Sequence, residues 1–383
     1  MNDEQNLRDR FEEISVPPTR LEVDALVEVG RRRAFRRRSW QAAGGVALAT
    51  GLLVAVPTLV IGDPAPPPPV VAAPTTPAKP TPPKACKAAT LRMPAGVTGA
   101  SANGVDPSGR YVIGHYFKGQ DFQPLLWTDG KPGKLPLEAP SMQLTSVNVN
   151  GVVAGLAEGP NLQYAFRYEN GRYTRLRTPP GLGWVYPYPA MNAAGDIVIN
   201  AKPEGESSGE NTVGLLYKAG TSAPIKLPLP ANSYVYDITD DGTIVGALKK
   251  DGVNKTAYAW DRNGRGRELK SVPGTTSIVY SAEGDWATGG LWPKNGDATP
   301  ARWNLRTGEL TQLKTGEGPG LAVNSDGWVL TTNELIRDGA NVALPTPANQ
   351  EIRTQGVSGS GLVVGHTVTV GKNAITGPRT WQC

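Results

Sequence analysis

A short pattern that returns seven times along the chain constrains its fold more than any other feature. Each copy resembles "DITDDGTIVG" at residues 237–246, two short strand-like runs around a turn glycine. The turn glycines are Gly109, Gly151, Gly195, Gly242, Gly284, Gly327 and Gly361, which lie 42, 44, 47, 42, 43 and 34 residues apart. A repeat of this length with strand-like content is typical of β-propeller blades of four strands each.

Two columns of residues keep the same distance from these glycines. Four positions before the glycine the residue is apolar: Val105, Val147, Met191, Ile238, Tyr280, Val323 and Val357. Three positions before it the residue is small and polar: Asp106, Asn148, Asn192, Thr239, Ser281, Asn324 and Ser358. A strand that enters a turn stabilised by an Asn, Asp, Ser or Thr side chain needs this pair, so the columns predict the inner hairpin of each blade.

The second half of each unit predicts another hairpin, with a large residue before the turn and a leucine after it. The large residues are Trp127, Tyr168, Tyr217, Trp260, Trp303, Ile336 and Trp381, and the leucines are Leu135, Leu176, Leu227, Leu269, Leu313 and Leu344. The seventh leucine is missing because the chain ends, but "TLRMPAG" at 90–96 matches the other leucine strands. We therefore predict an all-β, seven-bladed propeller over residues 86–383, in which the N-terminal strand completes the last blade and removes its free edge.

The two cysteines lie on either side of this expected closure. Cys383 is two residues past Trp381, and Cys86 is five residues before Leu91. Counted on Trp127 and Leu135, these places correspond to neighbouring positions 129 and 130 in an uninterrupted turn. We therefore predict a Cys86–Cys383 disulfide; two unpaired thiols are the alternative.

The first 85 residues predict three joined pieces. Residues 1–38 are polar, can form short helices and end in six arginines, at 31–33 and 36–38. Residues 39–62 carry no charge and are long enough for a transmembrane helix. Residues 63–85 form a proline-rich linker. The positive-inside rule predicts a single-pass cell-membrane protein with a cytoplasmic N-terminus and an extracytoplasmic propeller. A cleaved signal peptide at residues 39–62 is the alternative, and a core helix a further one.

The repeat also resembles a known family. The pattern N-x-x-G-x-V-V-G, returning about every forty residues over 86–383, is similar to the bacterial extracellular HAF-type repeat. The arginine-rich segment, apolar run and proline-rich linker resemble the front end of membrane-anchored proteins of high-GC Gram-positive bacteria. The resemblance implies a surface-displayed propeller and brings no enzymatic residues with it.

Candidate catalytic and metal-binding residues are few. The chain has two histidines, His115 and His366, at equivalent places in neighbouring blades, where they are expected to lie too far apart to share a metal ion. Asp and Asn before Gly are explained by tight turns, and Ser358 by its column. We therefore expect no metal and no cofactor, although a catalytic carboxylate pair stays open. The net charge of +5 is small and no basic stripe with aromatics is apparent, so nucleic-acid binding is not expected.

Aromatic residues gather in the connections between hairpins and between blades. These connections, among them "GHYFKGQDFQP" at 114–124, are expected to be long and to share one face of the propeller. The candidate ligand-binding residues there are Trp184, Tyr186, Tyr188, Tyr234 and Trp292. Aromatic rings of this kind either stack on sugars and peptides or pack between blades.

Two classes of function follow. The first is a non-catalytic binding module for a protein, a peptide or a cell-wall glycan, with a monomeric ectodomain. The alternatives are an extracytoplasmic propeller hydrolase or lyase, or a signalling membrane protein that recruits a cytosolic partner through residues 1–38. The scarcity of histidine and of acidic clusters favours the binding module.

Overall fold

A computed structural model of the chain describes residues 84–383 except 185–187, 207–210, 251–252, 315–317 and 373. The expected cytoplasmic segment, transmembrane helix and nearly all of the linker lie outside the described residues. The described part consists of strands and turns, and it includes no helix of the length and apolar character that a membrane crossing requires.

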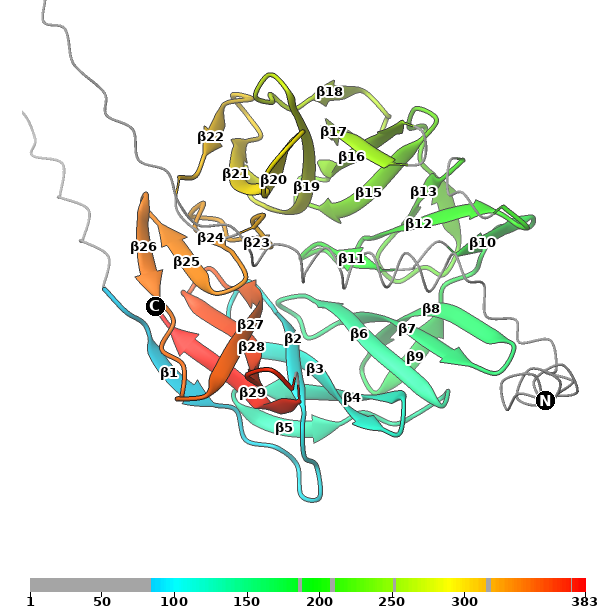
Figure 1. The fold of residues 1–383 in the computed structure, drawn as a ribbon. Coiled ribbons are helices and arrows are strands. Elements are labelled where there is room, and N and C mark those ends of the chain that lie inside the picture. Colours follow the sequence, from blue (N-terminus) through cyan, green and yellow to red (C-terminus); the bar gives the residue numbers. More distant parts are fainter. Residues whose placement is uncertain (1–83, 185–187, 207–210, 251–252, 315–317, 373) are drawn as a thin grey trace, which may run out of the picture. The chain divides into compact units, whose positions relative to one another are not determined.

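Seven antiparallel sheets follow one another along the chain (Figure 1). Blade 1 contains β2 (Ser101–Val105), β3 (Tyr111–Lys118), β4 (Asp121–Thr128) and β5 (Lys131–Lys134). Blade 2 contains β6 (Ser141–Val147), β7 (Val153–Gly159), β8 (Leu162–Glu169) and β9 (Arg172–Arg175). In blade 3 the inner strand has two pieces, β10 (Leu182–Trp184) and β11 (Ala190–Met191), followed by β12 (Ile197–Pro203), β13 (Val213–Tyr217) and β14 (Pro224–Lys226).

The remaining blades repeat this order. Blade 4 contains β15 (Ser233–Ile238), β16 (Ile244–Lys250), β17 (Val253–Trp260) and β18 (Gly266–Glu268). Blade 5 contains β19 (Thr275–Glu283), β20 (Trp286–Pro293), β21 (Thr299–Asn304) and β22 (Leu310–Gln312). Blade 6 contains β23 (Ala322–Val323), β24 (Val329–Leu330), β25 (Glu334–Arg337) and β26 (Ala340–Ala343). Blade 7 contains β27 (Gln350–Val357), β28 (Leu362–Thr369), β29 (Ile375–Gln382) and, from the other end of the domain, β1 (Lys87–Thr90).

The inner strands form a closed ring. Contacts run from β2 to β6, β11, β15, β19, β23 and β27, and from β27 back to β2. The predicted all-β, seven-bladed propeller is therefore confirmed.

The leucine column fixes the register of the outer strands. In blades 1 to 5 the backbone N–H of the leucine donates to the carbonyl three residues before the large residue; examples are Leu135 to Pro124 (3.3 Å) and Leu269 to Ala257 (2.9 Å). In the closing blade Leu91 donates to the Pro378 carbonyl at 3.2 Å, three residues before Trp381. The N-terminal strand therefore occupies the place that the repeat predicts.

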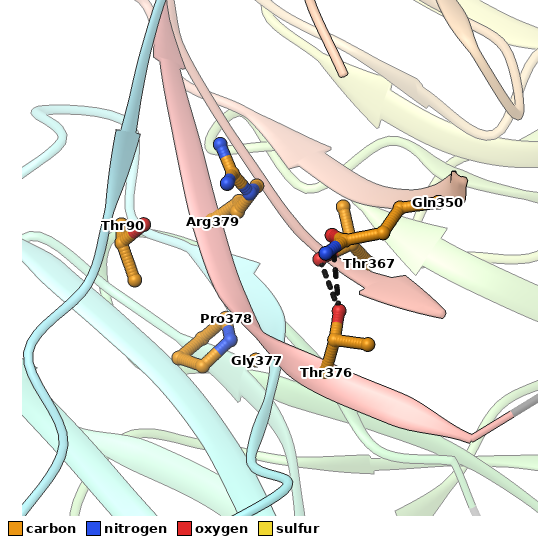
Figure 2. Close-up of a pocket in the computed structure, with 7 residues that line it drawn as sticks. All are labelled: Thr90, Gln350, Thr367, Thr376, Gly377, Pro378 and Arg379. Carbon is orange, nitrogen blue, oxygen red and sulfur yellow. Dashed lines mark hydrogen bonds between the residues drawn. The ribbon is translucent and has the colours of Figure 1, made fainter. Parts of the chain in front are cut away.

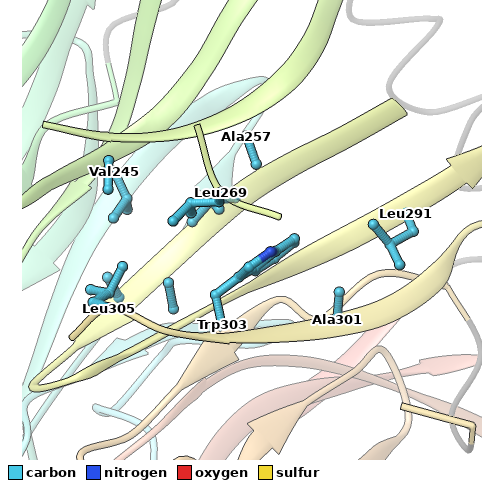
Figure 3. Packing of buried hydrophobic residues seen from close by; sticks show 11 residues of the cluster. Val245, Ala257, Leu269, Leu291, Ala301, Trp303 and Leu305 are labelled. Atoms are coloured by element: carbon cyan, nitrogen blue, oxygen red, sulfur yellow. The ribbon is translucent and has the colours of Figure 1, made fainter. Parts of the chain in front are cut away.

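The large residues join neighbouring blades. The indole N–H of Trp303 in blade 5 donates to the carbonyl of Lys270, which follows the leucine of blade 4, at 2.7 Å. Figure 3 shows Trp303 between the two sheets, beside Leu269. Equivalent bonds run from Trp127 to Arg92, Trp381 to Pro345, Tyr217 to Arg177 and, from a different position in the blade, Tyr173 to Pro136. Side-chain donors thus find acceptors at five of the seven blade interfaces, and the donors of four of them are buried.

The polar column makes a second set of bonds between blades. Asn148 and Asn324 each accept backbone N–H groups of their own turn while their amide groups donate to the next blade, to the carbonyls of Ala193 and Ser358. Each side chain therefore stabilises a turn and an interface together.

Blade 5 departs from the register that the sequence predicts. Its turn is shorter, and Glu283 pairs with Trp286 in the ladder while Ala282 pairs with Ala287. The apolar and polar columns are therefore occupied there by Ala282 and Glu283, in place of Tyr280 and Ser281. Glu283 accepts the backbone N–H of Ser325 in blade 6, so it also bonds to the next blade.

The closing strand is held by a disulfide and by the neighbouring blade. Cys86 and Cys383 form the predicted disulfide, with Cα atoms 4.5 Å apart and a sequence separation of 297. Before β1 the chain also bonds to β26 of blade 6, because the Cys86 N–H donates to the Ala343 carbonyl at 2.9 Å and the Ala343 N–H donates to Lys84 at 3.1 Å. The segment thus bridges blades 6 and 7.

We expect loss of the disulfide to destabilise the propeller strongly. Because the bond closes a loop of nearly the whole domain, chain entropy predicts a decrease on the order of 5 kcal/mol in the free energy of unfolding. The Cys383→Ser protein should melt at a clearly lower temperature than the wild type, and reductant should lower the wild type to the same value. The Cys86→Ser/Cys383→Ser protein, which reductant cannot change, is the control. Equal melting temperatures for oxidised and reduced wild type would contradict this role.

Candidate functional site

Strand order assigns every loop to one of two faces. The turns between first and second strands, and between third and fourth strands, share one face, which we call the turn face. The turns between second and third strands and the links between blades share the other, which we call the connection face. "GHYFKGQDFQP" is not a long loop: it forms the ends of β3 and β4 around a short turn at Gly119 and Gln120. The loops of the connection face are therefore not uniformly longer than the turns of the turn face, although the sequence predicts that they are.

Five inner strands carry a β-bulge at the same level of the channel. The ladders shift by one residue in β2, β6, β15, β19 and β27. The bulged residues are Asn103, Thr145, Tyr236, Tyr280 and Gln355. A bulge changes the direction in which a side chain points, so these five residues are oriented differently from their neighbours on the strands that line the channel.

Four aromatic rings form a continuous row across blades 4 and 5. The ring centroids of Tyr234 and Tyr236 lie 4.9 Å apart, those of Tyr236 and Tyr280 5.3 Å, and those of Tyr280 and Trp292 6.0 Å. The Lys249 ammonium lies 4.6 Å from the centre of the Tyr234 ring. We call Tyr234, Tyr236, Tyr280 and Trp292 the aromatic row. Tyr234 and Trp292 lie at the ends of β15 and β20 toward the connection face, whereas Tyr236 and Tyr280 occupy the bulges farther along β15 and β19.

The five candidate residues from the sequence occupy different environments. Trp184 is partly buried and packs against the core of blades 2 and 3. Tyr234 is 5% exposed, and Trp292 is partly buried; both belong to the aromatic row. Tyr188 is 50% exposed and lies two residues before β11. Tyr186 lies outside the described residues.

Three of the six exposed large apolar side chains among the described residues lie on the connection face. Phe117 is near the end of β3, Leu137 follows β5 and Val370 follows β28, whereas Tyr188 lies between the two pieces of the blade 3 inner strand. A cleft of about 490 Å³ opens on the same face in blade 3, between Leu182, Pro203, Thr212, Lys226 and Leu229. Its volume suits a small ligand or a side chain of a partner.

A second, smaller hollow lies in blade 7 and has a different character. Figure 2 shows Gln350 and Thr367 side by side with Thr376 bonded to both, and Arg379 between these residues and Thr90. The Thr376 hydroxyl lies 2.7 Å from that of Thr367 and 3.1 Å from the Gln350 side-chain oxygen. At about 80 Å³ this hollow holds a few water molecules rather than a sugar ring.

Ser101, Asn103 and His115 form a closed hydrogen-bonded group in blade 1. The Asn103 amide donates to Nδ1 of His115 at 2.7 Å, so Nε2 carries the proton and donates to Ser101 Oγ at 3.2 Å. Burial and the charge of His366 lower the pKa of His115 to about 3. In this arrangement His115 cannot accept the serine proton, and Ser101 is only 1% exposed. The group therefore does not act as a nucleophile and base.

Carboxylates gather near the turn face of the channel. Burial raises the pKa of Glu283 to about 8, and the charges of Asp237, Asp240 and Asp106 add to this. Burial raises the pKa of Asp237 to about 6, although its carboxylate accepts the N–H groups of Ala282 and Ile238. The described residues include no group of three or more His, Cys, Asp or Glu side chains positioned to hold a metal ion.

Sequence reasoning missed Tyr236, Tyr280 and Glu283. Tyr280 was assigned to the apolar column because the shorter turn of blade 5 shifts the count from Gly284. Alignment on Gly289, which pairs with Val279 as Gly246 pairs with Val235, gives the correct register.

Comparisons with known proteins support the fold alone. No family model and no curated protein matches the sequence. Oligogalacturonate lyase from Vibrio parahaemolyticus superimposes with a TM-score of 0.55 at 9% identity, over 78% of this chain and 93% of that one. The acylaminoacyl peptidase of Pyrococcus horikoshii gives 0.54 at 11% identity, over 75% and 51%. TolB from Acinetobacter baumannii gives 0.42 at 11%, over 74% and 64%. The chain thus matches only part of the last two proteins.

The contribution of Asp237 and Glu283 to the free energy of unfolding should decrease as pH rises. Both raised pKa values mean that folded Asp237 and Glu283 bind protons more tightly than the unfolded chain does. Their contribution is complete below about pH 4 and is lost as pH rises through about 6 for Asp237 and about 8 for Glu283. We expect Glu283→Gln to melt like the wild type near pH 4 and at a higher temperature near pH 9. The exposed Glu268→Gln is the control, and a wild-type melting temperature that does not fall with pH would contradict the assignment.

Proposed function

We propose that the propeller is a non-catalytic binding module, displayed outside the cell membrane, that takes a peptide, a protein segment or a cell-wall glycan on its connection face. The observation that carries the proposal is the gathering of exposed Phe117, Leu137 and Val370 and the blade 3 cleft on one face of the ring, with Tyr234 and Trp292 at strand ends toward the same face and half-exposed Tyr188 in the inner strand of blade 3. Aromatic surfaces with an apolar body and a polar edge suit sugar rings and peptide strands.

The Ser101 group also supports binding over catalysis. Its serine is buried and its histidine is held in the tautomer that donates toward the serine, so this pairing serves packing. We propose the same packing role for Tyr234, whose buried ring lies at the end of the aromatic row and supports the more exposed ring of Tyr236.

A second candidate is an extracytoplasmic hydrolase or lyase. The raised pKa of Glu283 favours it, because a carboxyl group that stays protonated near neutral pH suits a general acid. Glu283 also bonds to Ser325 between blades, as the polar column does elsewhere, which favours a structural role.

Membrane display is the second part of the proposal. We propose that residues 39–62 span the membrane, that residues 1–38 are cytoplasmic and open to a cytosolic partner, and that the linker leads to the rim of the propeller at Lys84. The arginine cluster, the uncharged run and a disulfide suited to an oxidising compartment support this arrangement. The HAF-type assignment belongs to the same proposal.

We expect Tyr188→Ala to weaken binding to isolated cell-wall material or to a surface partner by roughly tenfold, as for a central aromatic contact. The melting temperature should change little because the side chain is half exposed. Ile225→Ala, at the same 50% exposure but on the outer strand β14, is the matched control. Equal weakening by both variants, or by neither, would refute the site. Trp184→Ala should instead lower stability, because Trp184 packs against the core.

Protease added to intact spheroplasts should remove the propeller and leave a small membrane-bound N-terminal fragment. Permeabilised cells are the control, in which that fragment should be degraded too. Full protection of the propeller contradicts the proposed topology, and a soluble mature form supports signal-peptide cleavage.

A further inference from the structure

The outer strands carry charges of almost one sign. Across the seven outer strands the charged residues are seven cations and one acid; the cations are Lys87, Lys131, Lys134, Arg172, Arg175, Lys226 and Arg267, and the acid is Glu268. The whole chain has 39 basic and 34 acidic residues, so the outer strands are much more basic than the average. All seven cations are exposed, and none forms an ion pair with another described residue.

The cations recur at fixed places in the repeat. Four positions before the leucine stand Lys87, Lys131, Arg172 and Arg265; one position before it stand Lys134, Arg175 and Lys226; one position after it stand Arg92, Arg177, Lys270 and Lys314. They are scattered in sequence, and the propeller brings them together on its rim. Figure 1 shows β1, β5 and β18 on the outside of the ring.

Edge protection explains part of this pattern, since charges on an outer strand prevent pairing with another sheet. Lysine is the residue most often used for that purpose, but here arginine shares the same repeat positions with lysine. The single sign and the absence of ion-pair partners point to an anionic ligand.

The extent of the basic rim indicates which shape of ligand can contact all of its cations. Outer-strand cations occupy the consecutive blades 7, 1, 2, 3 and 4, and are absent from the outer strands of blades 5 and 6. Five of seven blades span more than half of the circumference. A flat lipid surface meets only one sector of such a rim, whereas a flexible chain can follow it.

We propose that the rim of blades 7, 1, 2, 3 and 4 binds a flexible linear polyanion with phosphodiester or phosphate groups along its length, as an envelope polymer would present. Lysine and arginine at repeated spacing contact successive phosphates, and release of counterions from the polymer drives binding. This site is separate from the connection face, so it stands whether or not that face binds a ligand.

The test uses full-length protein in nanodiscs of neutral lipid, in a parent with the six arginines at 31–33 and 36–38 changed to Gln. The probe is long-chain inorganic polyphosphate, and tripolyphosphate is the short comparison. We expect the long chain to bind far more tightly per phosphate, with an affinity that falls steeply with salt. The variant Lys87→Gln/Lys131→Gln/Lys226→Gln, with one change in each of three blades, should lose roughly tenfold or more in affinity and about two units of salt slope.

The matched control is Lys118→Gln/Lys294→Gln/Lys372→Gln, three exposed lysines at turns of the connection face. It removes the same charge and should bind polyphosphate like the parent. Equal losses in both triple variants would show a general charge effect and overturn the site. Competition by phosphatidylglycerol vesicles stronger than by polyphosphate would assign the rim to a membrane, and tighter binding of single-stranded DNA of equal charge would assign it to nucleic acid; either result overturns the proposal.

Discussion

The pairing of β1 with β29 is the interaction on which the rest of the structure depends. Each blade covers one face of the next, and only a closed ring leaves no blade uncovered. Leu91 takes the last place in the leucine column by bonding to Pro378, and the Cys86–Cys383 disulfide replaces the covalent turn that other blades possess. The same segment also serves blade 1, because the Trp127 indole donates to the Arg92 carbonyl just after β1. One strand therefore completes blade 7 and supports the interface to blade 1.

The periodic part of this design could be predicted from the sequence because it repeats. Seven copies of one turn gave the blade number, and the missing seventh leucine gave the closing strand and the disulfide. The count failed in blade 5, where the turn at Gly284 is shorter and places Glu283 in the polar column. Counting residues back from the turn glycine gives the wrong column positions when the turn length changes. Gly289 gives the correct positions because it pairs with Val279 across the strands, as Gly246 pairs with Val235.

The functional surfaces were harder to predict because they lie outside the columns. Trp184 and Tyr188 are close in sequence, yet one packs against the core and the other is half exposed, since only the fold decides which side of a strand is covered. Tyr236 and Tyr280 meet across two blades through bulges that no sequence pattern marks. The basic rim could not be predicted although its cations do follow the repeat. They recur at about forty-residue intervals, so a search for a local run of basic residues does not find them.

The central functional claim is that ligand binding takes place on the connection face of the channel. Hydrogen exchange of the full-length protein, with and without isolated cell-wall material or the surface partner it captures, tests this most directly. We expect slower exchange upon binding in amides near Tyr188, at the start of β15 and in β20 near Trp292, with the turns around Gly109 and Gly242 unchanged. Protection confined to those turns on the opposite face would contradict it.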